Sequence, residues 1–381
     1  MKLTFFTNFI NHHQVPVADE LYKLLGKDYT FVANIPMPQE FIDNGYPDFS
    51  DKPYLLKAFE NNVNFQKALE LGLSSDVVII GSASNDFIKK RLQLNKITFR
   101  YSERFLKKRF IGRGWYYLFK NHTLYRNKNM YMLCASAYTA NDAHKILAYP
   151  DKCYKWGYFT TVNKIDIDTI ISHKQNKSFK IIWVARFISW KHPEMVIELA
   201  KELKKKGYQF EIEMIGDGVL KDVIQKEIDL NDLRQYVTLP GSLPNEQVVK
   251  KMQESNAFLF TSDRNEGWGA VLNEAMSNGC TAVASNMIGS VPFLIENNIN
   301  GLIFKSGDLY SLINQVEKLI LNRDFCNNLA KNAYMSMDEV WSPKNAASNF
   351  IKLAQSFIDK STITIEMGPC SKAYPVKKNI K

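Results

Sequence analysis

Continuous apolar runs alternate with amphipathic patterns along the first 160 residues. The continuous runs predict strands over residues 3–7, 29–33, 76–80, 97–101 and 131–135. Apolar positions at helical spacing predict helices over residues 18–25 and 65–71. Strands that alternate with helices are typical of a parallel sheet with helices on both faces.

The same alternation begins again near residue 179. It predicts strands over residues 179–185, 210–215, 237–239, 257–261, 281–284 and 302–304. Pro193 opens a helix that Gly207 closes, and Pro244 opens another. Helical patterns follow from residue 308 to residue 358. We therefore expect an α/β fold made of two Rossmann-like domains.

These patterns also place the domain boundaries. We expect an N-terminal domain over residues 1–160 and a C-terminal domain over residues 161–345. A last helix covers residues 346–360, and the tail over residues 361–381 has little periodicity and is expected to be mobile. The length of 381 residues agrees with two domains, because single cores rarely exceed about 250–300 residues.

The composition predicts a cytoplasmic globular protein. Apolar residues make up 45% of the chain, and no stretch approaches the roughly 20 apolar residues of a membrane span. The first apolar run is too short for a signal peptide. The five cysteines are scattered and form no C-x-x-C pair, so we expect reduced thiols with neither zinc nor disulfides.

The formal charge is +10, and most of the excess falls within the first 160 residues. The densest basic run covers residues 104–128, where aromatic side chains lie between the cations. A solvated helical face with its aromatic residues in the core explains this run. An anionic membrane surface is the main functional alternative. Cations interleaved with aromatic side chains also suit nucleic acid. No nucleic-acid motif is present, however, so we expect no such partner.

The most informative motif is the segment from Glu266 to Glu274, which reads Glu-Gly-Trp-Gly-Ala-Val-Leu-Asn-Glu. It lies between a predicted strand and a predicted helix, and ligands bind at that edge of an open α/β sheet. Backbone amides at the start of a helix favour phosphate. Glu266 on the loop suits sugar hydroxyls, and Glu274 on the helix suits ribose hydroxyls. Without this context, the spacing also fits a solvated acidic pair near a helix start.

Two cations follow the neighbouring strand. Arg186 and Lys191 come after the predicted strand 179–185, which places them at the same sheet edge as Glu266. An arginine fork and a lysine point charge both suit phosphoryl oxygens. Gly216 follows the next strand in a Gly-Asp-Gly sequence, which permits close approach to a ligand or forms a plain turn.

Polar loops also follow the strands of the first half. Asn11 and His13 lie in the first strand–helix loop, and Arg100, Glu103 and Arg104 lie at the end of another strand. Both groups are candidates for contact with an acceptor, with ordinary loop polarity or mutual ion pairing as the alternative. No H-E-x-x-H pattern is present, so no metal site is expected.

Several of these motifs match a known family. The sequences Thr-Ser-Asp-Arg-Asn-Glu-Gly-Trp-Gly at 261–269 and Asn-Glu-Ala-Met at 273–276 resemble the retaining glycosyltransferases of family four, which have the GT-B fold. The loop with Arg186 and Lys191 and the sequence Asn-Gly-Leu-Ile-Phe at 300–304 are similar to the same family. The similarity is strong over residues 179–307. Residues 8–16 and 155–159 resemble a subgroup of bacterial surface-polysaccharide or lipopolysaccharide transferases.

This resemblance implies a cleft between an acceptor-binding first domain and a donor-binding second domain, with the last helix packed back on the first. It implies that Glu274 takes the ribose hydroxyls and that Glu266 takes hydroxyls of the donor sugar. Arg186 and Lys191 would stabilise the leaving diphosphate. The implied donor-binding set also contains Gly216, Gly267, Trp268, Gly269, Ala270 and Val271. The implied reaction retains the anomeric configuration and needs no metal or other cofactor, because the two cations do the work of a metal.

The first half departs from the family pattern in two places. Many members carry a Gly-Gly pair in the first loop, and this chain has none before Pro16. Many also carry a histidine about where Arg100 or Tyr101 stands here. The family pattern therefore says less about the acceptor side than about the donor side.

The sequence as a whole predicts a hexosyltransferase. It would move a sugar from a nucleotide-diphosphate donor to a glycan or lipid-linked acceptor in the synthesis of lipopolysaccharide, capsule or another surface polysaccharide. We expect it in the cytoplasm, with the inner face of the cytoplasmic membrane as a candidate docking surface. The alternatives are a nucleotide-sugar epimerase on the same scaffold and a binding protein for anionic membranes or nucleic acid.

Overall fold

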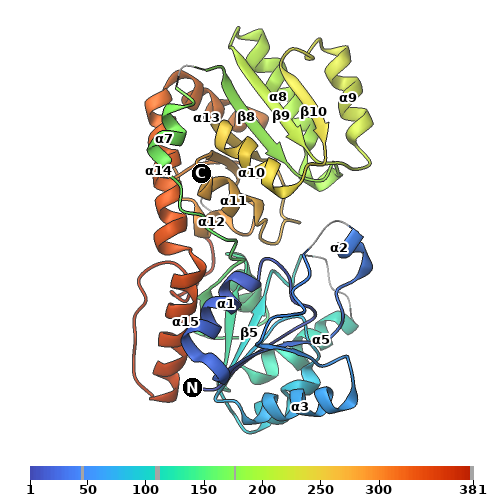
Figure 1. The fold of residues 1–381 in the computed structure, drawn as a ribbon, viewed down its shortest axis with the longest axis vertical. Coiled ribbons are helices and arrows are strands. Elements are labelled where there is room, and N and C mark those ends of the chain that lie inside the picture. The colour runs from blue at the N-terminus through green and yellow to red at the C-terminus, as the bar shows by residue number, and fades with distance from the viewer. Residues whose placement is uncertain (44–46, 108–111, 176, 378–381) are drawn as a thin grey trace. The chain divides into compact units, whose positions relative to one another are not determined.

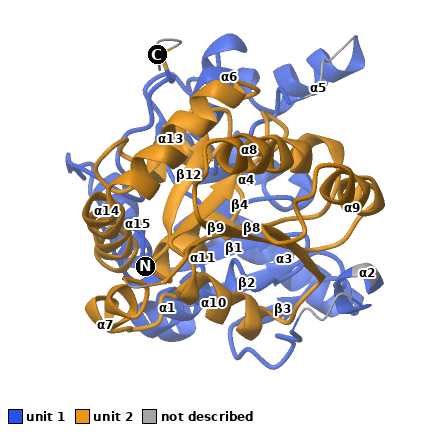
Figure 2. Cartoon of the chain, turned by 90° about the horizontal axis from the view of Figure 1, so that it is seen from above, with its two compact units in different colours: residues 1–161, 340–376 blue, residues 162–339, 377–381 orange. Residues whose placement is uncertain are grey.

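Figure 1 shows the computed structural model, which describes residues 1–43, 47–107, 112–175 and 177–377. Contacts along the chain divide it into two units, which Figure 2 colours separately. Unit 1 contains Met1–Thr161 and Val340–Val376, and unit 2 contains Val162–Glu339. The chain thus returns to unit 1 at residue 340, before the expected boundary at 345.

Unit 1 is built on a seven-stranded parallel sheet with the order β3-β2-β1-β4-β5-β6-β7. The central strands are buried on both faces, which is why they read as continuous apolar runs. The strands are β1 (Leu3–Thr7), β2 (Tyr29–Ala33), β3 (Leu55–Lys57), β4 (Val77–Ile80), β5 (Thr98–Ser102), β6 (Met130–Cys134) and β7 (Cys153–Lys155).

Helices cover the sheet of unit 1. They are α1 (Val15–Leu25), α2 (Gln39–Asp43), α3 (Asn62–Ser74), α4 (Lys89–Gln93), α5 (Arg113–Asn121), α6 (Thr139–Lys145) and the C-terminal α15 (Pro343–Ile358). α15 lies beside α1 (Figure 1). Phe350 of α15 lies 5.0 Å from Phe99 between ring centroids, and Phe357 stacks on Tyr131 at 4.1 Å. Aromatic packing therefore holds the last helix against strands β5 and β6.

Unit 2 repeats this construction with a six-stranded parallel sheet of order β10-β9-β8-β11-β12-β13. The strands are β8 (Phe179–Val184), β9 (Phe210–Ile215), β10 (Val237–Gly241), β11 (Ala257–Phe260), β12 (Thr281–Ser285) and β13 (Leu302–Phe304). The helices are α7 (Ile167–Ser172), α8 (Pro193–Lys205), α9 (Lys221–Leu230), α10 (Asn245–Glu254), α11 (Val271–Ser277), α12 (Val291–Leu294), α13 (Leu309–Leu321) and α14 (Arg323–Met335). A π-helical turn over Ser336–Val340 follows α14.

The sequence pattern misses two edge strands of unit 1, β3 and β7. Each contains three residues, which is too short to show a period of two. Both strands form only because a longer neighbour offers its backbone groups, β2 in one case and β6 in the other.

The prediction of a mobile tail from residue 361 is wrong over its middle part. Cys370 N–H donates to Lys155 O at 2.7 Å, and Lys155 N–H donates to Ser371 O at 2.8 Å. Ala373 N–H donates to Cys153 O at 3.0 Å. The tail thus satisfies the outer edge of β7, an edge that a protein otherwise has to protect. Residues 378–381 of the predicted tail lie outside the described residues.

A fully buried arginine, Arg91, ties three elements of unit 1 together. Its Nη1 donates to Ser75 O at 2.6 Å, and its Nη2 donates to Asp76 O and Ile97 O, both at 2.6 Å. These carbonyls lie at the end of α3 and just before β4 and β5. Arg91 therefore supplies donors to backbone carbonyls where these three elements meet.

We expect Arg91→Met to lower the free energy of unfolding of unit 1 by about 3 kcal/mol or more, because several buried carbonyls lose their donors together. Thermal unfolding followed by circular dichroism measures the change. Lys90→Met, at the exposed neighbouring position of α4, is the matched control and should leave the melting temperature nearly unchanged. Equal melting temperatures for the two variants would contradict this role of Arg91.

Candidate functional site

The donor-side candidates gather at the carboxyl edge of the sheet of unit 2. Glu266 follows β11, and its side chain is 11% exposed. Its carboxylate forms an ion pair with Lys191 and accepts a hydrogen bond from Ser262 Oγ at 3.1 Å. Lys191 ends a short 3-10 helix (Ser189–Lys191) that follows β8, and its side chain is also 11% exposed. The two charges are therefore neutralised by each other in a largely buried position.

The loop that carries Lys191 is bonded directly to the loop that carries Glu266. Thr261 Oγ1 donates to Lys191 O at 2.6 Å, and the indole N–H of Trp183 donates to Thr261 Oγ1 at 2.9 Å. The ammonium of Lys191 also lies 4.3 Å from the ring centroid of Trp190. These contacts hold the ion pair in place from both adjacent strands, β8 and β11.

Glycine is required at two positions of this edge. Gly216 has φ +136°, and a Cβ there would lie 2.0 Å from Ala185 O. Gly269 has φ +82°, and a Cβ there would lie 2.3 Å from the ring of Phe260. Gly216 thus lets the end of β9 approach the loop that leads to Arg186, which is the turn interpretation of the Gly-Asp-Gly sequence.

Arg186 follows β8 directly and is exposed. Its backbone carbonyl accepts a hydrogen bond from Ile188 N–H at 2.9 Å, which tightens the turn toward Lys191. The structure thus brings Arg186 and Lys191 to one loop, as the sequence predicts, but in different environments. Lys191 is largely buried and paired, whereas Arg186 extends from the exposed part of the loop.

Glu274 lies on α11, the helix that follows the Glu266 loop. Burial raises the pKa of its carboxyl from 4.5 to about 7. A carboxylate held in a partly desolvated position without a compensating cation is a feature of functional sites more often than of solvated helix faces.

Trp268 belongs to the segment 267–270, whose backbone amides are expected to approach a donor, and its side chain points into the core. The indole is fully buried, and its N–H donates to Asn273 Oδ1 at 2.9 Å. Its carbonyl accepts from Ser290 Oγ at 2.6 Å. The ring is therefore part of the core that supports the loop, and the neighbours Gly267, Ala270 and Val271 can reach a ligand mainly through their backbone groups.

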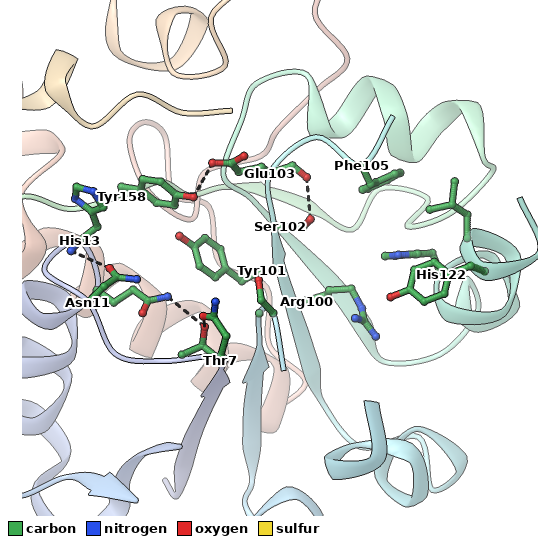
Figure 3. Close-up of a pocket in the computed structure, with 16 residues that line it drawn as sticks. Thr7, Asn11, His13, Arg100, Tyr101, Ser102, Glu103, Phe105, His122 and Tyr158 are labelled. Atoms are coloured by element: carbon green, nitrogen blue, oxygen red, sulfur yellow. Dashed lines mark hydrogen bonds between the residues drawn. The ribbon is translucent and has the colours of Figure 1, made fainter. Parts of the chain in front are cut away.

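A separate cavity of about 480 Å³ opens at the carboxyl edge of the sheet of unit 1 (Figure 3). It lies at the ends of β1, β4 and β5, and it brings together Asn11, His13, Arg100 and Glu103 from the sequence prediction. Other residues that line it are Thr7, Asn8, Gln14, Tyr101, Phe105, Tyr117, His122 and Tyr158. Its volume is within the usual range of small-molecule sites, about 300–1,000 Å³.

One side of this cavity is made by His13, Tyr158 and Glu103. The rings of His13 and Tyr158 are stacked, with centroids 5.4 Å apart, and Tyr158 Oη donates to Glu103 Oε1 at 2.6 Å (Figure 3). Burial, with a smaller effect from His12, lowers the pKa of His13 to about 3, so this imidazole is neutral at pH 7. Glu103 is ion-paired with Lys107.

Arg100 and His122 make the opposite side. Arg100 is 7% exposed, and its Nη2 donates to Asn85 Oδ1 at 2.8 Å. His122 Nδ1 lies 2.7 Å from the hydroxyl of Tyr149. Burial and then the charge of Arg100 lower the pKa of His122 to about 3. The positive charge on this side therefore belongs to Arg100 alone.

The structure does not bring Arg104 into the cavity, in contrast to the sequence prediction. Its Nη2 lies 3.3 Å from Asp142 Oδ1, and Asp142 is fully buried at the start of α6. The guanidinium also lies 5.1 Å from the ring centroid of Tyr138. Arg104 thus has a structural role, because removing it would leave a buried carboxylate with too few donors.

The basic run at 104–128 includes α5, whose surface is rich in aromatic side chains. Trp115, Tyr116 and Phe119 are 48%, 66% and 52% exposed, so the aromatic residues of this helix are not core residues. The exposed cations Arg113 and Lys120 lie on the same helix. Residues 108–111 of the predicted run, which include two of its cations, lie outside the described residues.

Four residues that complete these sites were not predicted as site residues from the sequence. Ser262 could have been found, because it is a polar residue directly after a buried strand and before Glu266. Gln14 and Tyr158 could also have been found, because they lie in the family-like segments 8–16 and 155–159. His122 leaves no such signal, since it reaches the cavity from a distant part of the chain.

No group of three or more His, Cys, Asp or Glu side chains that could hold a metal occurs in the part of the chain that the structure describes. Among the described helices, none combines the length and apolar character needed to cross a bilayer.

Comparison with known proteins finds one family model that matches the second unit. Residues 165–336 match the family described as Glycosyl transferases group 1. This range lies within unit 2 and contains the segment from Arg186 to Glu274 with all donor-side candidates.

Curated relatives are glycosyltransferases. The chain is 33% identical to the amylovoran biosynthesis glycosyltransferase AmsK of Erwinia amylovora, over 36% of this chain and 35% of AmsK. It is 25% identical to a poly(ribitol-phosphate) alpha-N-acetylglucosaminyltransferase of Staphylococcus aureus, over 52% of this chain and 39% of that protein. The capsular polysaccharide biosynthesis glycosyltransferase CapM of S. aureus is 23% identical over 64% and 67%. The matches to the first two relatives thus span little more than a third of their lengths.

Solved structures match the whole fold. Anabaena Alr3699/HepE in complex with UDP has a TM-score of 0.67 and 14% identity, over 94% of this chain and 99% of that chain. The lipopolysaccharide outer core galactosyltransferase WaaB has a TM-score of 0.65 and 16% identity, over 92% and 100%. At these identities the likeness shows the fold alone, and it confirms the predicted fold class of two Rossmann-like domains.

The chain therefore has the GT-B fold, its residues 165–336 match the model of the glycosyl transferases group 1, and its curated relatives include glycosyltransferases of polysaccharide biosynthesis.

Proposed function

We propose that this chain is a retaining glycosyltransferase that moves a sugar from a nucleotide-diphosphate donor to a glycan or lipid-linked acceptor in polysaccharide synthesis. The observation that supports the proposal most is the buried Glu266 carboxylate, paired with Lys191 and bonded by Ser262 at the carboxyl edge of the sheet. The names of relatives such as AmsK and CapM agree with this reaction class.

In the proposed donor complex, the two glutamates bind the two sugars of the donor. Glu274 accepts hydrogen bonds from the ribose hydroxyls. These bonds replace the hydrogen bonds from water that the carboxylate loses through burial. Glu266 accepts from hydroxyls of the transferred sugar. Backbone amides of Gly267 and Ala270 contribute further donors beside them.

The cations act on the charge that develops during transfer. The bond from the anomeric carbon to the phosphate oxygen breaks, and the bond to the acceptor oxygen forms on the same face. The acceptor proton passes to the leaving phosphate oxygen. Arg186 and Lys191 stabilise the growing negative charge of the diphosphate, so the proposed reaction needs no metal ion.

The chemistry of α5 supports work at a membrane surface. Exposed aromatic rings of Trp115, Tyr116 and Phe119 insert well at the headgroup level, and Arg113 and Lys120 attract anionic lipids. We therefore propose that the protein acts in the cytoplasm and docks on the inner face of the cytoplasmic membrane, where a lipid-linked acceptor would be available.

Incubation with candidate donors, with and without acceptors, tests the reaction class. The protein is mixed with a panel of nucleotide-sugars, with and without membrane extracts that contain glycan acceptors, and the products are separated by mass and by sugar identity. Transfer to an acceptor with release of the nucleoside diphosphate supports the proposal. Conversion of the donor to its epimer in the absence of an acceptor would instead identify an epimerase and overturn it.

Arg186→Ala should lower kcat at least about 100-fold, because one preorganised donor to a developing charge is worth that much. The melting temperature should stay within a degree or two, since the side chain is exposed. Lys226→Ala, which removes an exposed cation of α9, is the control and should retain full activity. A parallel loss of stability and activity in Arg186→Ala would argue against a catalytic role.

Glu274→Gln should raise the free energy of unfolding at high pH while it weakens donor binding. The unfolded carboxyl ionises near pH 4.5, while the folded one keeps its proton up to about pH 7, so the wild type loses stability as pH rises between these values. The variant has no such loss. It should be more stable than the wild type at pH 8, by up to about 3 kcal/mol, and equally stable at pH 4.

The same variant should bind a nucleotide-sugar roughly tenfold more weakly or worse, because an amide accepts fewer hydroxyl donors than a carboxylate. Thermal melts across pH and calorimetric titration measure the two effects. Glu254→Gln, on the exposed face of α10, should change neither. Unchanged donor affinity in Glu274→Gln would remove this residue from the donor site.

Replacing Trp115 and Phe119 together by serine should reduce binding to vesicles that contain 30–40% anionic lipid about tenfold or more, since two interfacial rings are lost. Sedimentation with vesicles measures the binding, and neutral vesicles serve as the comparison. Replacing Leu230 by serine, an exposed apolar residue at the end of α9, is the matched control. Equal binding by all three proteins would place the membrane contact elsewhere or exclude it.

A further inference from the structure

The cavity of unit 1 contains a buried cation without an anionic partner. The protein partners of the Arg100 guanidinium are neutral, namely Asn85 Oδ1 at 2.8 Å and the hydroxyl of Tyr149. The carboxylates in this region are engaged elsewhere, since Glu103 pairs with Lys107 and Asp142 pairs with Arg104. Among the described residues, therefore, no carboxylate is paired with Arg100.

The same cavity gathers polar atoms that lack partners. Arg100 Nε, His13 Nδ1 and Gln14 Oε1 are all buried, and none has a hydrogen-bond partner within the described part of the chain. All three residues line this one cavity. Buried polar groups are nearly always satisfied in folded proteins, so these three atoms make the wall of the cavity unusually polar, although each is closed to solvent.

The electrostatics of the cavity select the charge of that ligand. His13 and His122 are neutral because burial lowers the pKa of each to about 3. Glu103 is balanced by Lys107. The remaining charge is the guanidinium, which is 7% exposed and cannot lose its proton, and a buried charge of this type needs an opposite charge.

The rest of the lining suits a sugar. Tyr101 and Tyr158 present aromatic rings to the cavity (Figure 3). Asn8 and Asn11 line it with side-chain amides, which can both donate to and accept from hydroxyls. A guanidinium fork matches the two oxygens of a carboxylate or a phosphate.

We propose that this cavity binds an acidic saccharide, whose carboxylate or phosphate ester accepts hydrogen bonds from Arg100 while its ring and hydroxyls contact Tyr101, Tyr158 and the amides. This inference rests on the proposed function, because the acidic saccharide is the acceptor of the transferred sugar. It narrows the acceptor from any glycan to a glycan whose terminal residue carries a negative charge.

The diphosphate of the donor is a second source of the same chemistry. An anion site for the donor would bind UDP or another nucleoside diphosphate and would be indifferent to the acidity of a saccharide. If the cavity binds an acidic saccharide, the affinity for acidic sugars depends on Arg100. If it binds the donor diphosphate, the affinity for UDP depends on Arg100.

The test measures the binding of four probes to the full chain by ligand-observed NMR and by calorimetry. They are methyl β-glucuronide, glucose 6-phosphate, methyl β-glucoside and UDP. We expect the wild type to bind at least one of the two acidic sugars at least tenfold more tightly than the neutral glucoside. Arg100→Gln should abolish this preference and leave UDP affinity within about twofold of the wild type.

Two variants keep the result interpretable. Arg100→Lys retains the charge and should keep part of the preference for acidic sugars. If Arg100→Gln does not fold, a reduced preference in Arg100→Lys with unchanged UDP affinity supports the same conclusion. Lys89→Gln removes one exposed charge from the neighbouring α4 without touching the cavity, and should behave as the wild type.

Three outcomes would overturn the inference. The first is a wild type without preference for either acidic sugar, and the second is a preference that survives in Arg100→Gln. The third is an Arg100→Gln variant that loses UDP affinity instead. Because no sugar transfer is measured, failure of the proposed function would leave the acid preference intact, and the two failures can be told apart.

Discussion

The ion pair between Lys191 and Glu266 is the contact on which the carboxyl edge of unit 2, the proposed donor site, depends. Each residue follows a different strand of unit 2, so the pair joins the ends of β8 and β11 across the sheet edge. Both side chains are largely buried, and removing either would leave the other as an uncompensated charge. Ser262 and the bond from Thr261 to the Lys191 carbonyl fix the same geometry. A donor that takes hydrogen bonds from either partner must therefore compete with, or share, a contact that already exists.

The two units share one architecture but carry different side chains at the carboxyl edges of their sheets. In each, a parallel sheet ends in polar loops at its carboxyl edge, because strand interiors are buried on both faces and only the ends can carry polar side chains. In unit 2 that edge holds paired charges and a carboxyl, Glu274, whose pKa burial raises. In unit 1 it holds neutral histidines, tyrosines and Arg100, for which the described residues provide no carboxylate partner. The first arrangement suits a ligand with hydroxyls and phosphates, and the second suits an acidic sugar.

Some residues that carry a motif turn out to support the site without facing it. Trp268 interrupts the glycines of the Glu266 loop, and its ring is core, anchored by Asn273. Arg104 directly follows a cavity residue, Glu103, yet its guanidinium is directed to Asp142. Sequence position alone cannot separate these cases, because consecutive side chains on a loop point in different directions. Burial and the identity of the hydrogen-bond partner separate them at once.

The sequence by itself predicted the fold class and the strands with continuous apolar runs, and it placed the candidates Glu266, Glu274, Arg186 and Lys191 after strands of one sheet. Local periodicity and the rule that ligands bind at strand ends are sufficient for that. Only the tertiary structure decided that Lys191 pairs with Glu266, that the tail bonds to β7, and that Arg100, His13 and His122 share one cavity. Each of these contacts joins segments distant in the chain, and the burial that shifts a pKa or isolates a charge exists only after those segments have packed together.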